Sequence, residues 1–197
     1  MFDSSAVIQD ITRHCQAEPS FAMAYFYFDF NDLKKQQSRY LVRSLLTQFS
    51  VQCSQCPEAL TAVYYQHLNR AQEPTTQSLL VALKQIIQSF QNAYIVIDAL
   101  DVCVDREDLF VFVQEVVEWN LDKLHILVTS RRERYIADCL EPLIPGPAQI
   151  NLHTELNGGD IRTYCRQRLR RDSKFHKWPP EELANIESIL GDGARGM

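Results

Sequence analysis

The stretch Tyr94-Ile-Val-Ile-Asp-Ala-Leu-Asp-Val-Cys103 determines how the rest of this chain is interpreted. Four apolar residues run into Asp98, and a second aspartate, Asp101, follows three residues later. A short apolar run of this kind is typical of a strand that is buried on both faces of a parallel sheet. Open α/β sheets bind their ligands beyond the carboxyl ends of the strands. We therefore expect Asp98 to lie at a ligand-binding edge.

The composition limits the class of protein. The chain has 197 residues, 46% of them hydrophobic, and a formal net charge of −5. It can bury one sizeable core, and its charge argues against a general nucleic-acid-binding surface. Its apolar runs are too short to span a membrane, and its N-terminus has no secretory signal. Because the six cysteines mostly lie in apolar periodic stretches, we expect them to be reduced and the protein to be cytoplasmic. The net charge and the short apolar runs predict that it has no nucleic-acid or membrane partner.

Other apolar segments predict an alternation of strands and helices. Residues 22–30 and 125–129 read as further buried strands, and residues 149–152 as a short one. Helices are predicted from Val7, Ile8, Ile11 and Cys15; from Leu41, Leu45 and Phe49; from Leu79, Leu83, Ile86, Ile87 and Phe90 after Thr75; from Leu109, Val113, Val116 and Val117; and from Ile136, Cys139 and Leu140. Asp160 is expected to cap a basic helix, and Trp178-Pro-Pro180 to open the last one. This order predicts a parallel sheet with helices on both faces.

Asp98 and Asp101 have the form of a Walker B segment, in which the first carboxylate helps to hold Mg²⁺ on a nucleotide. The alternative is a buried strand whose terminal aspartate caps a loop. No glycine precedes Gly146, so residues 1–145 contain no G-x-x-x-x-G-K-[ST] phosphate loop.

Thr129-Ser-Arg-Arg132 follows the next strand and should emerge at the same edge as Asp98. An arginine there can approach a γ-phosphate and sense its presence. The alternative is a solvated arginine pair. The two motifs together, separated by one helix, are more specific than either alone.

Three weaker patterns favour structural interpretations. Cys53-Ser-Gln-Cys56 has no accompanying second ligand pair, so a zinc or redox site is not favoured. Arg166-Gln-Arg-Leu-Arg-Arg171 is more typical of a solvated helix face than of a phosphate or membrane site. The aromatic run Tyr25-Phe-Tyr-Phe-Asp-Phe30 fits a core strand better than a base-stacking platform.

Together these segments resemble the NACHT class of signal-transduction NTPases, and more closely the nephrocystin-type (nephrocystin 3-like) N-terminal NTPase domain of fungal NLR-like proteins. The resemblance rests on Ala24-Tyr-Phe-Tyr-Phe-Asp-Phe-Asn-Asp32, Tyr94-Ile-Val-Ile-Asp-Ala-Leu-Asp-Val-Cys103 and Ile126-Leu-Val-Thr-Ser-Arg131. Asp160-Ile-Arg-Thr-Tyr164 and Trp178-Pro-Pro180 continue it, so it covers nearly the whole chain.

The resemblance implies a phosphate-loop NTPase-like (STAND) parallel sheet in the strand order 5-1-4-3-2. It also implies a switch that binds ATP or GTP with Mg²⁺ and acts through self-association or other signalling-protein domains. By position, Asp98 would be the Mg²⁺-associated aspartate, Asp101 the acidic residue of the second Walker B pair, and Arg131 the nucleotide-sensing arginine.

Two departures from the family pattern change this expectation. The family has a glutamate where this chain has Val102, which cannot polarise water, so hydrolysis would rest on Asp101 alone. Strand 1 and the phosphate loop are expected just before Ser4. We therefore expect a partial nucleotide-binding core over residues 1–155, with a gap in the sheet beside residues 125–129, and the start of a helical subdomain over residues 156–197.

The sequence thus predicts an incomplete NACHT-type switch module that binds nucleotide poorly or not at all as this chain. One alternative is a non-catalytic interaction or scaffold fragment that associates with intact family members. Another is a phosphate loop encoded upstream of Met1.

Overall fold

A computed structural model describes residues 4–53, 58, 60–63, 65, 73–144, 146–150, 156–175 and 177–193. The contacts divide the chain into two compact units, one of which is Asp3–Ile144 and the other of which includes Pro145–Met197. The predicted boundary after residue 155 stays a prediction, because residues 151–155 lie outside the described part.

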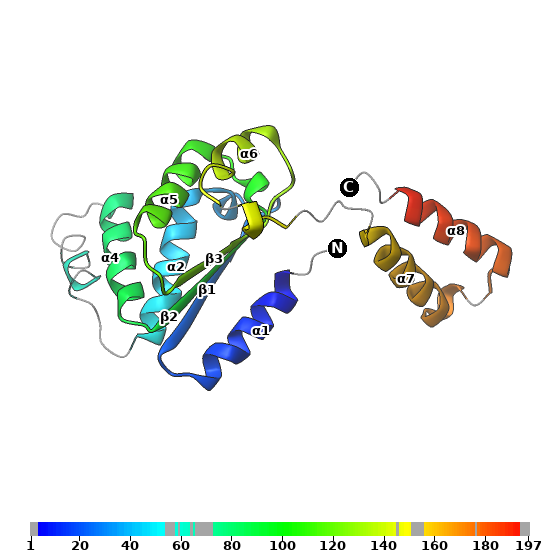
Figure 1. Ribbon diagram of the computed structural model, residues 1–197, viewed down its shortest axis with the longest axis horizontal. Helices are drawn as coiled ribbons and strands as arrows, with labels where there is room; N and C mark the ends of the chain where they lie inside the picture. The colour runs from blue at the N-terminus through cyan, green and yellow to red at the C-terminus, as the bar shows by residue number, and fades with distance from the viewer. Residues whose placement is uncertain are drawn as a thin grey trace. The chain divides into compact units, whose positions relative to one another are not determined.

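The first unit contains a three-stranded parallel sheet with the order β1-β2-β3 (Figure 1). The strands are β1 (Phe21–Tyr27), β2 (Asn92–Asp98) and β3 (Leu124–Val128). Tyr27 is the register partner of Asp98, so the first two strands end at the same level. The predicted α/β class and parallel sheet are confirmed, and the three strands lie where the apolar runs predict them.

Two of the predicted strands differ from the prediction. Strand β1 stops at Tyr27 instead of continuing to Phe30. There the Asp29 carboxylate accepts the Asn31 N–H at 2.9 Å and the Asp29 N–H donates to the Lys35 carbonyl at 3.2 Å, which turns the chain away from the sheet. Residues 149 and 150 are not in a strand, so that part of the predicted 149–152 strand is wrong, and its other residues lie outside the described part.

Helices cover both faces of the sheet, as predicted. Figure 1 shows α2 (Ser38–Gln52), α4 (Thr76–Gln88) and α5 (Arg106–Glu118) on one face and α1 (Ser4–Ala17) on the other. Two short 3-10 turns, η1 (Lys34–Gln36) and η2 (Leu100–Val102), follow β1 and β2. Helix α6 (Arg134–Leu140) follows β3. The larger core lies between the sheet and the α2, α4 and α5 layer.

The helical periodicity predicts most of the core correctly. Leu41, Leu45 and Phe49 of α2 are fully buried, and Ile8 of α1 packs on Met23 and Val96 in a smaller cluster. Two helical assignments need correction. In α5, Phe112 is buried while Val117 is exposed, and in α6, Cys139 is exposed. The buried stripe of α5 therefore includes Phe112 in place of Val117.

The outer edge of β1 is closed by two side-chain amides from α2. Gln48 Oε1 accepts the Tyr25 N–H at 3.1 Å, and Gln48 Nε2 donates to the Tyr25 carbonyl at 2.8 Å. Gln52 makes the same pair of bonds to Met23, at 3.1 and 2.8 Å. Each primary amide thus occupies the donor and the acceptor that a further strand would use.

The outer edge of β3 differs. Among the described residues, β3 pairs only with β2. His125 and Ile126 are exposed, Ile126 to 37%. The prediction that residues 125–129 form a fully buried strand is therefore wrong in burial although right in position. Burial of an apolar strand depends on what lies beside it, and no described segment pairs with this edge.

The second unit contains two helices, α7 (Leu156–Arg171) and α8 (Pro180–Gly193), with the short turns η3 (Gly146–Ala148) and η4 (Ser173–Phe175). Helix α7 begins four residues before Asp160, so Asp160 lies inside the helix and the prediction that it caps the helix is wrong. The Arg166 guanidinium donates to the Glu187 carboxylate at 2.7 Å and joins α7 to α8. Over the whole described part, no helix combines the length and the apolarity that crossing a membrane requires.

Candidate functional site

Asp98 lies at the carboxyl edge of the sheet between the ends of the two neighbouring strands. Its carbonyl accepts the Phe28 N–H at 3.1 Å on the β1 side. On the β3 side, the Thr129 N–H donates to the Ile97 carbonyl at 2.9 Å, and the Thr129 carbonyl accepts the Leu100 N–H at 3.0 Å. The predicted convergence of the two motifs is therefore present, because parallel neighbours end at one edge.

The Thr129 hydroxyl orients the Asp98 carboxylate. It donates to Asp98 Oδ1 and accepts the Ala99 N–H at 3.1 Å. Within the described part, Asp98 Oδ2 has no hydrogen-bond donor from the protein. One carboxylate oxygen is thus fixed by the fold, and the other remains available to a ligand.

Ala99 turns the chain sharply after Asp98. It adopts the left-handed conformation with φ 59° and ψ 53°, which costs an alanine about 1 kcal/mol. The Ala99 carbonyl accepts the Val102 N–H at 3.0 Å, which closes the η2 turn. As a result, the second aspartate does not continue along the strand direction.

Asp101 instead faces Arg131. Asp101 Oδ1 accepts the Arg131 N–H at 3.1 Å, and Asp101 Oδ2 lies 3.5 Å from Arg131 Nε. The Asp101 side chain is only 6% exposed, whereas that of Arg131 is 77% exposed. The carboxylate is thus held in the protein, while the arginine side chain lies mostly in solvent. The exposed guanidinium is therefore within reach of an anion from solvent.

Val102 belongs to the core. Its side chain is 6% exposed and packs in the larger cluster with Leu100 and Cys103. An ionised side chain at this depth would lose its hydration without a compensating partner. In this chain the position therefore contributes packing and not a carboxylate.

The residues that follow Val102 form a polar link that sequence reasoning missed. The Asp105 carboxylate accepts the Ser38 N–H at 2.9 Å and the Ser38 hydroxyl at 2.7 Å, and the Cys103 thiol donates to it at 3.1 Å. Burial, reinforced by the neighbouring Asp105, raises the pKa of Cys103 to about 12. Asp105 thereby caps α2 from the start of α5, a tertiary contact that no local pattern indicates.

A metal ion would find only part of a coordination sphere here. Among the described residues, no group of three or more His, Cys, Asp or Glu side chains could hold a metal ion. Mg²⁺ is commonly bound through one or two carboxylates together with substrate phosphates and water. The single available oxygen of Asp98 fits that mode, and it does not fit a metal held by protein ligands alone.

Two of the weaker sequence patterns receive structural explanations. Arg166 and Arg168 of the basic stretch pair with Glu187 and Asp172, at 2.7 and 3.7 Å. Strand β1 carries Tyr25, Phe26 and Tyr27 of the aromatic run, whereas Phe30 lies beyond the strand and is exposed. In the C-x-x-C pattern, Cys53 is partly buried with its thiol sulfur 3.4 Å from the Ser89 hydroxyl oxygen, and Cys56 lies outside the described residues.

Comparison with known proteins gives one family. Residues 4–131 match the family model described as nephrocystin 3, N-terminal. This match includes all three strands and ends at Arg131, so it contains Asp98, Asp101 and Thr129. No curated protein and no solved structure matches the chain. The matched region covers well over half of the sequence, and the chain therefore belongs to the nephrocystin 3 N-terminal family.

Proposed function

We propose that this chain is part of a nucleotide-dependent signalling switch of the NACHT type, in which Asp98 helps to hold Mg²⁺ on ATP or GTP. The observation that carries the proposal is the position of Asp98. Its carboxylate lies at the carboxyl edge of a parallel sheet, held by Thr129 on one oxygen and free of protein donors on the other within the described part. We further propose that the switch works in the cytoplasm, through self-association or other signalling-protein domains.

Asp101 and Arg131 would form the sensing part of this site. In the structure they pair with each other at 3.5 Å. A γ-phosphate carries more charge than one carboxylate and offers several acceptor oxygens, so it would compete with Asp101 for the exposed guanidinium. Loss of the γ-phosphate would return Arg131 to Asp101. With Val102 buried in the core, water activation would rest on Asp101 alone.

This chain by itself should bind nucleotide weakly. Its sequence contains no G-x-x-x-x-G-K-[ST] loop to surround the phosphates with backbone N–H groups and a lysine. Titration of the chain with fluorescent ATP and Mg²⁺ should therefore give no saturable binding in the micromolar range, with or without Asp98→Asn. Micromolar binding that Asp98→Asn weakens would contradict this expectation.

A second function is favoured by the outer edge of β3, which no described segment pairs. Such an edge suits a non-catalytic interaction module that associates with intact family members. Size-exclusion chromatography with a family member that contains a phosphate loop separates the two functions. The switch proposal expects a complex that requires ATP and Mg²⁺ and that is lost with Asp98→Asn. A complex that forms without nucleotide and tolerates Asp98→Asn would favour the interaction module, and absence of any complex would count against both.

A further inference from the structure

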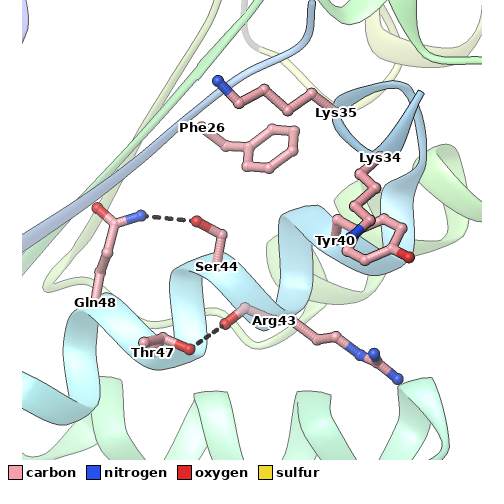
Figure 2. A pocket seen from close by; sticks show the side chains of 8 residues that line it. All are labelled: Phe26, Lys34, Lys35, Tyr40, Arg43, Ser44, Thr47 and Gln48. Atoms are coloured by element: carbon pink, nitrogen blue, oxygen red, sulfur yellow. Dashed lines mark hydrogen bonds between the residues drawn. The ribbon is translucent and has the colours of Figure 1, made fainter. Parts of the chain in front are cut away.

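A shallow pocket lies between the end of β1 and the first turns of α2. It has a volume of about 370 Å³, which is in the range of small-molecule sites. Figure 2 shows the Phe26 ring in its middle, with η1 on one side and α2 on the other. Phe26 is largely buried, so the interior of the pocket is apolar although its rim is polar.

Two lysines on the rim give the pocket a positive charge. Lys34 and Lys35 are both exposed, and neither forms an ion pair with another described residue. Their backbone N–H groups donate to Asp32 Oδ1 at 2.9 and 3.4 Å, which fixes the η1 turn that carries both lysines. In Figure 2 the Lys34 side chain extends toward Tyr40 and the Lys35 side chain extends past Phe26.

The third cation of the lining has another partner. Arg43 donates to the Glu73 carboxylate at 2.7 Å, and in Figure 2 its guanidinium points away from the pocket. The described residues that line the pocket include no carboxylate. The charge offered to a ligand is therefore that of two ammonium groups.

The α2 wall supplies neutral hydrogen-bonding groups. Ser44 Oγ accepts from Gln48 Nε2 at 3.0 Å, which leaves the Ser44 hydroxyl proton free to be donated to a ligand. Thr47 donates its own proton to the Arg43 carbonyl at 2.8 Å, so its oxygen can only accept. The pocket thus combines two cations and a hydroxyl donor with an aromatic floor.

We infer that this pocket binds a phosphate monoester carried on an aromatic or apolar body. A phosphate dianion matches the charge of two ammonium groups, which act on phosphate as point charges, whereas a carboxylate would leave one of them unmatched. The Phe26 ring would contact the apolar body. The residues that line the pocket do not include Asp98, Asp101, Thr129 or Arg131. A test of this pocket is therefore independent of the nucleotide proposal.

The experiment is a titration of the full ¹⁵N-labelled chain with phenyl phosphate in low salt and without Mg²⁺, followed by amide chemical shifts. We expect saturable shifts at the η1 and early α2 amides, with an affinity in the millimolar range that is typical of small ligands at solvated charges. Lys34→Gln combined with Lys35→Gln should weaken binding about tenfold. Lys174→Gln, an exposed lysine of the second unit, is the matched control and should leave binding unchanged.

Three further ligands test the parts of the inference. Phenol and inorganic phosphate should each bind more weakly than phenyl phosphate, because each lacks one half of the recognised group. The inference would be overturned if phenol or inorganic phosphate bound as tightly as phenyl phosphate. It would also be overturned if phenyl phosphate gave no saturable shifts, or if the double lysine variant bound it with unchanged affinity. A phosphotyrosine peptide identifies the source: tighter binding than phenyl phosphate indicates a protein ligand, and equal or weaker binding indicates a small molecule. Circular dichroism verifies that the double variant is folded, which is expected because both lysines are exposed.

Discussion

The Asp105 carboxylate caps a helix that begins 67 residues earlier in the chain. Burial acts to raise the pKa of Asp105, but the hydrogen bonds from the Ser38 hydroxyl, the Ser38 N–H and the Cys103 thiol outweigh it, and the pKa is lowered. A carboxyl whose pKa is lower in the folded than in the unfolded state stabilises the fold above its unfolded value. That stabilisation is lost as the pH falls through the folded value.

The charge of Asp105 should therefore contribute to stability in a pH-dependent way. Asp105→Asn should lower the free energy of unfolding at pH 7 by about 1 kcal/mol, a modest value because the carboxylate is partly solvated. The difference from the unsubstituted chain should shrink at pH 3, well below the ordinary value of 3.8. Urea unfolding at the two pH values measures both quantities. Asp138→Asn, at an exposed position, is the control. An equal loss at both pH values would show that the charge is not responsible.

The Thr129 hydroxyl is the second long-range link at the residue scale. Thr129→Val keeps the shape of the side chain but removes the hydroxyl that donates to the Asp98 carboxylate and accepts the Ala99 N–H. We expect a loss of about 1–2 kcal/mol, since two partly buried polar groups lose a partner. Thr47→Val is a matched control, because Thr47 is exposed and its hydroxyl donates to the Arg43 carbonyl within its own helix. Urea unfolding of both variants tests this, and equal losses would argue against a special role for Thr129.

At the scale of single elements, β1 has an edge that is closed by side chains rather than by another strand. The four hydrogen bonds of Gln48 and Gln52 depend on an amide that both donates and accepts. A glutamate at position 48 would lose the donor and place a carboxylate beside the Tyr25 carbonyl.

Gln48→Glu should destabilise the fold by about 1 kcal/mol, because the carboxylate and the Tyr25 carbonyl repel each other. When this repulsion moves the side chain away, the Tyr25 N–H loses its acceptor as well, so hydrogen exchange at the Tyr25 amide should increase. Gln9→Glu, on the exposed side of α1, is the matched control and should change neither measurement. Unchanged exchange at Tyr25 in the Gln48→Glu variant would show that the amide does not protect the edge.

Sequence patterns predict an element and its burial correctly when the residues of that element alone determine which of its side chains are buried. The spacing of Leu41, Leu45 and Phe49 is sufficient for α2, because a helix with one apolar stripe can only bury that stripe. The apolar side chain of Phe30 predicts that the strand continues to this residue, but the carboxylate of Asp29 ends the strand before it. The burial of Ile126 depends on the neighbour of β3, about which its own composition says nothing.

The candidate site divides in the same way. The shared edge of Asp98 and Arg131 was predictable, because parallel strands end on the same side. The contact of Asp101 with Arg131 was not, since it depends on the left-handed conformation of Ala99, which alanine rarely adopts. The Asp105 link was also not predictable, since it joins two helices far apart in sequence.

At the scale of the whole molecule, the chain consists of two compact units, and an ion pair joins the two helices of the second. Arg166 and Glu187 form a two-pronged pair between α7 and α8, and the hydrogen bonds that the guanidinium donates to the Glu187 carboxylate raise the pKa of Arg166. Arg166→Ala should therefore increase hydrogen exchange in α7 and α8 while exchange in β2 and α4 stays unchanged. Arg171→Ala, on the same helix and exposed, is the control and should change neither set. Faster exchange throughout the chain would show that the two units unfold together.

The difference between the two edges of the sheet determines where a further strand can pair. A strand that joined the sheet could do so only beside β3, because the amides of α2 occupy the β1 edge. If it joined in parallel, its carboxyl end would lie next to Thr129 and Arg131. Completing the sheet and completing the anion site would then be one event, so ligand binding and strand addition would each strengthen the other through thermodynamic linkage.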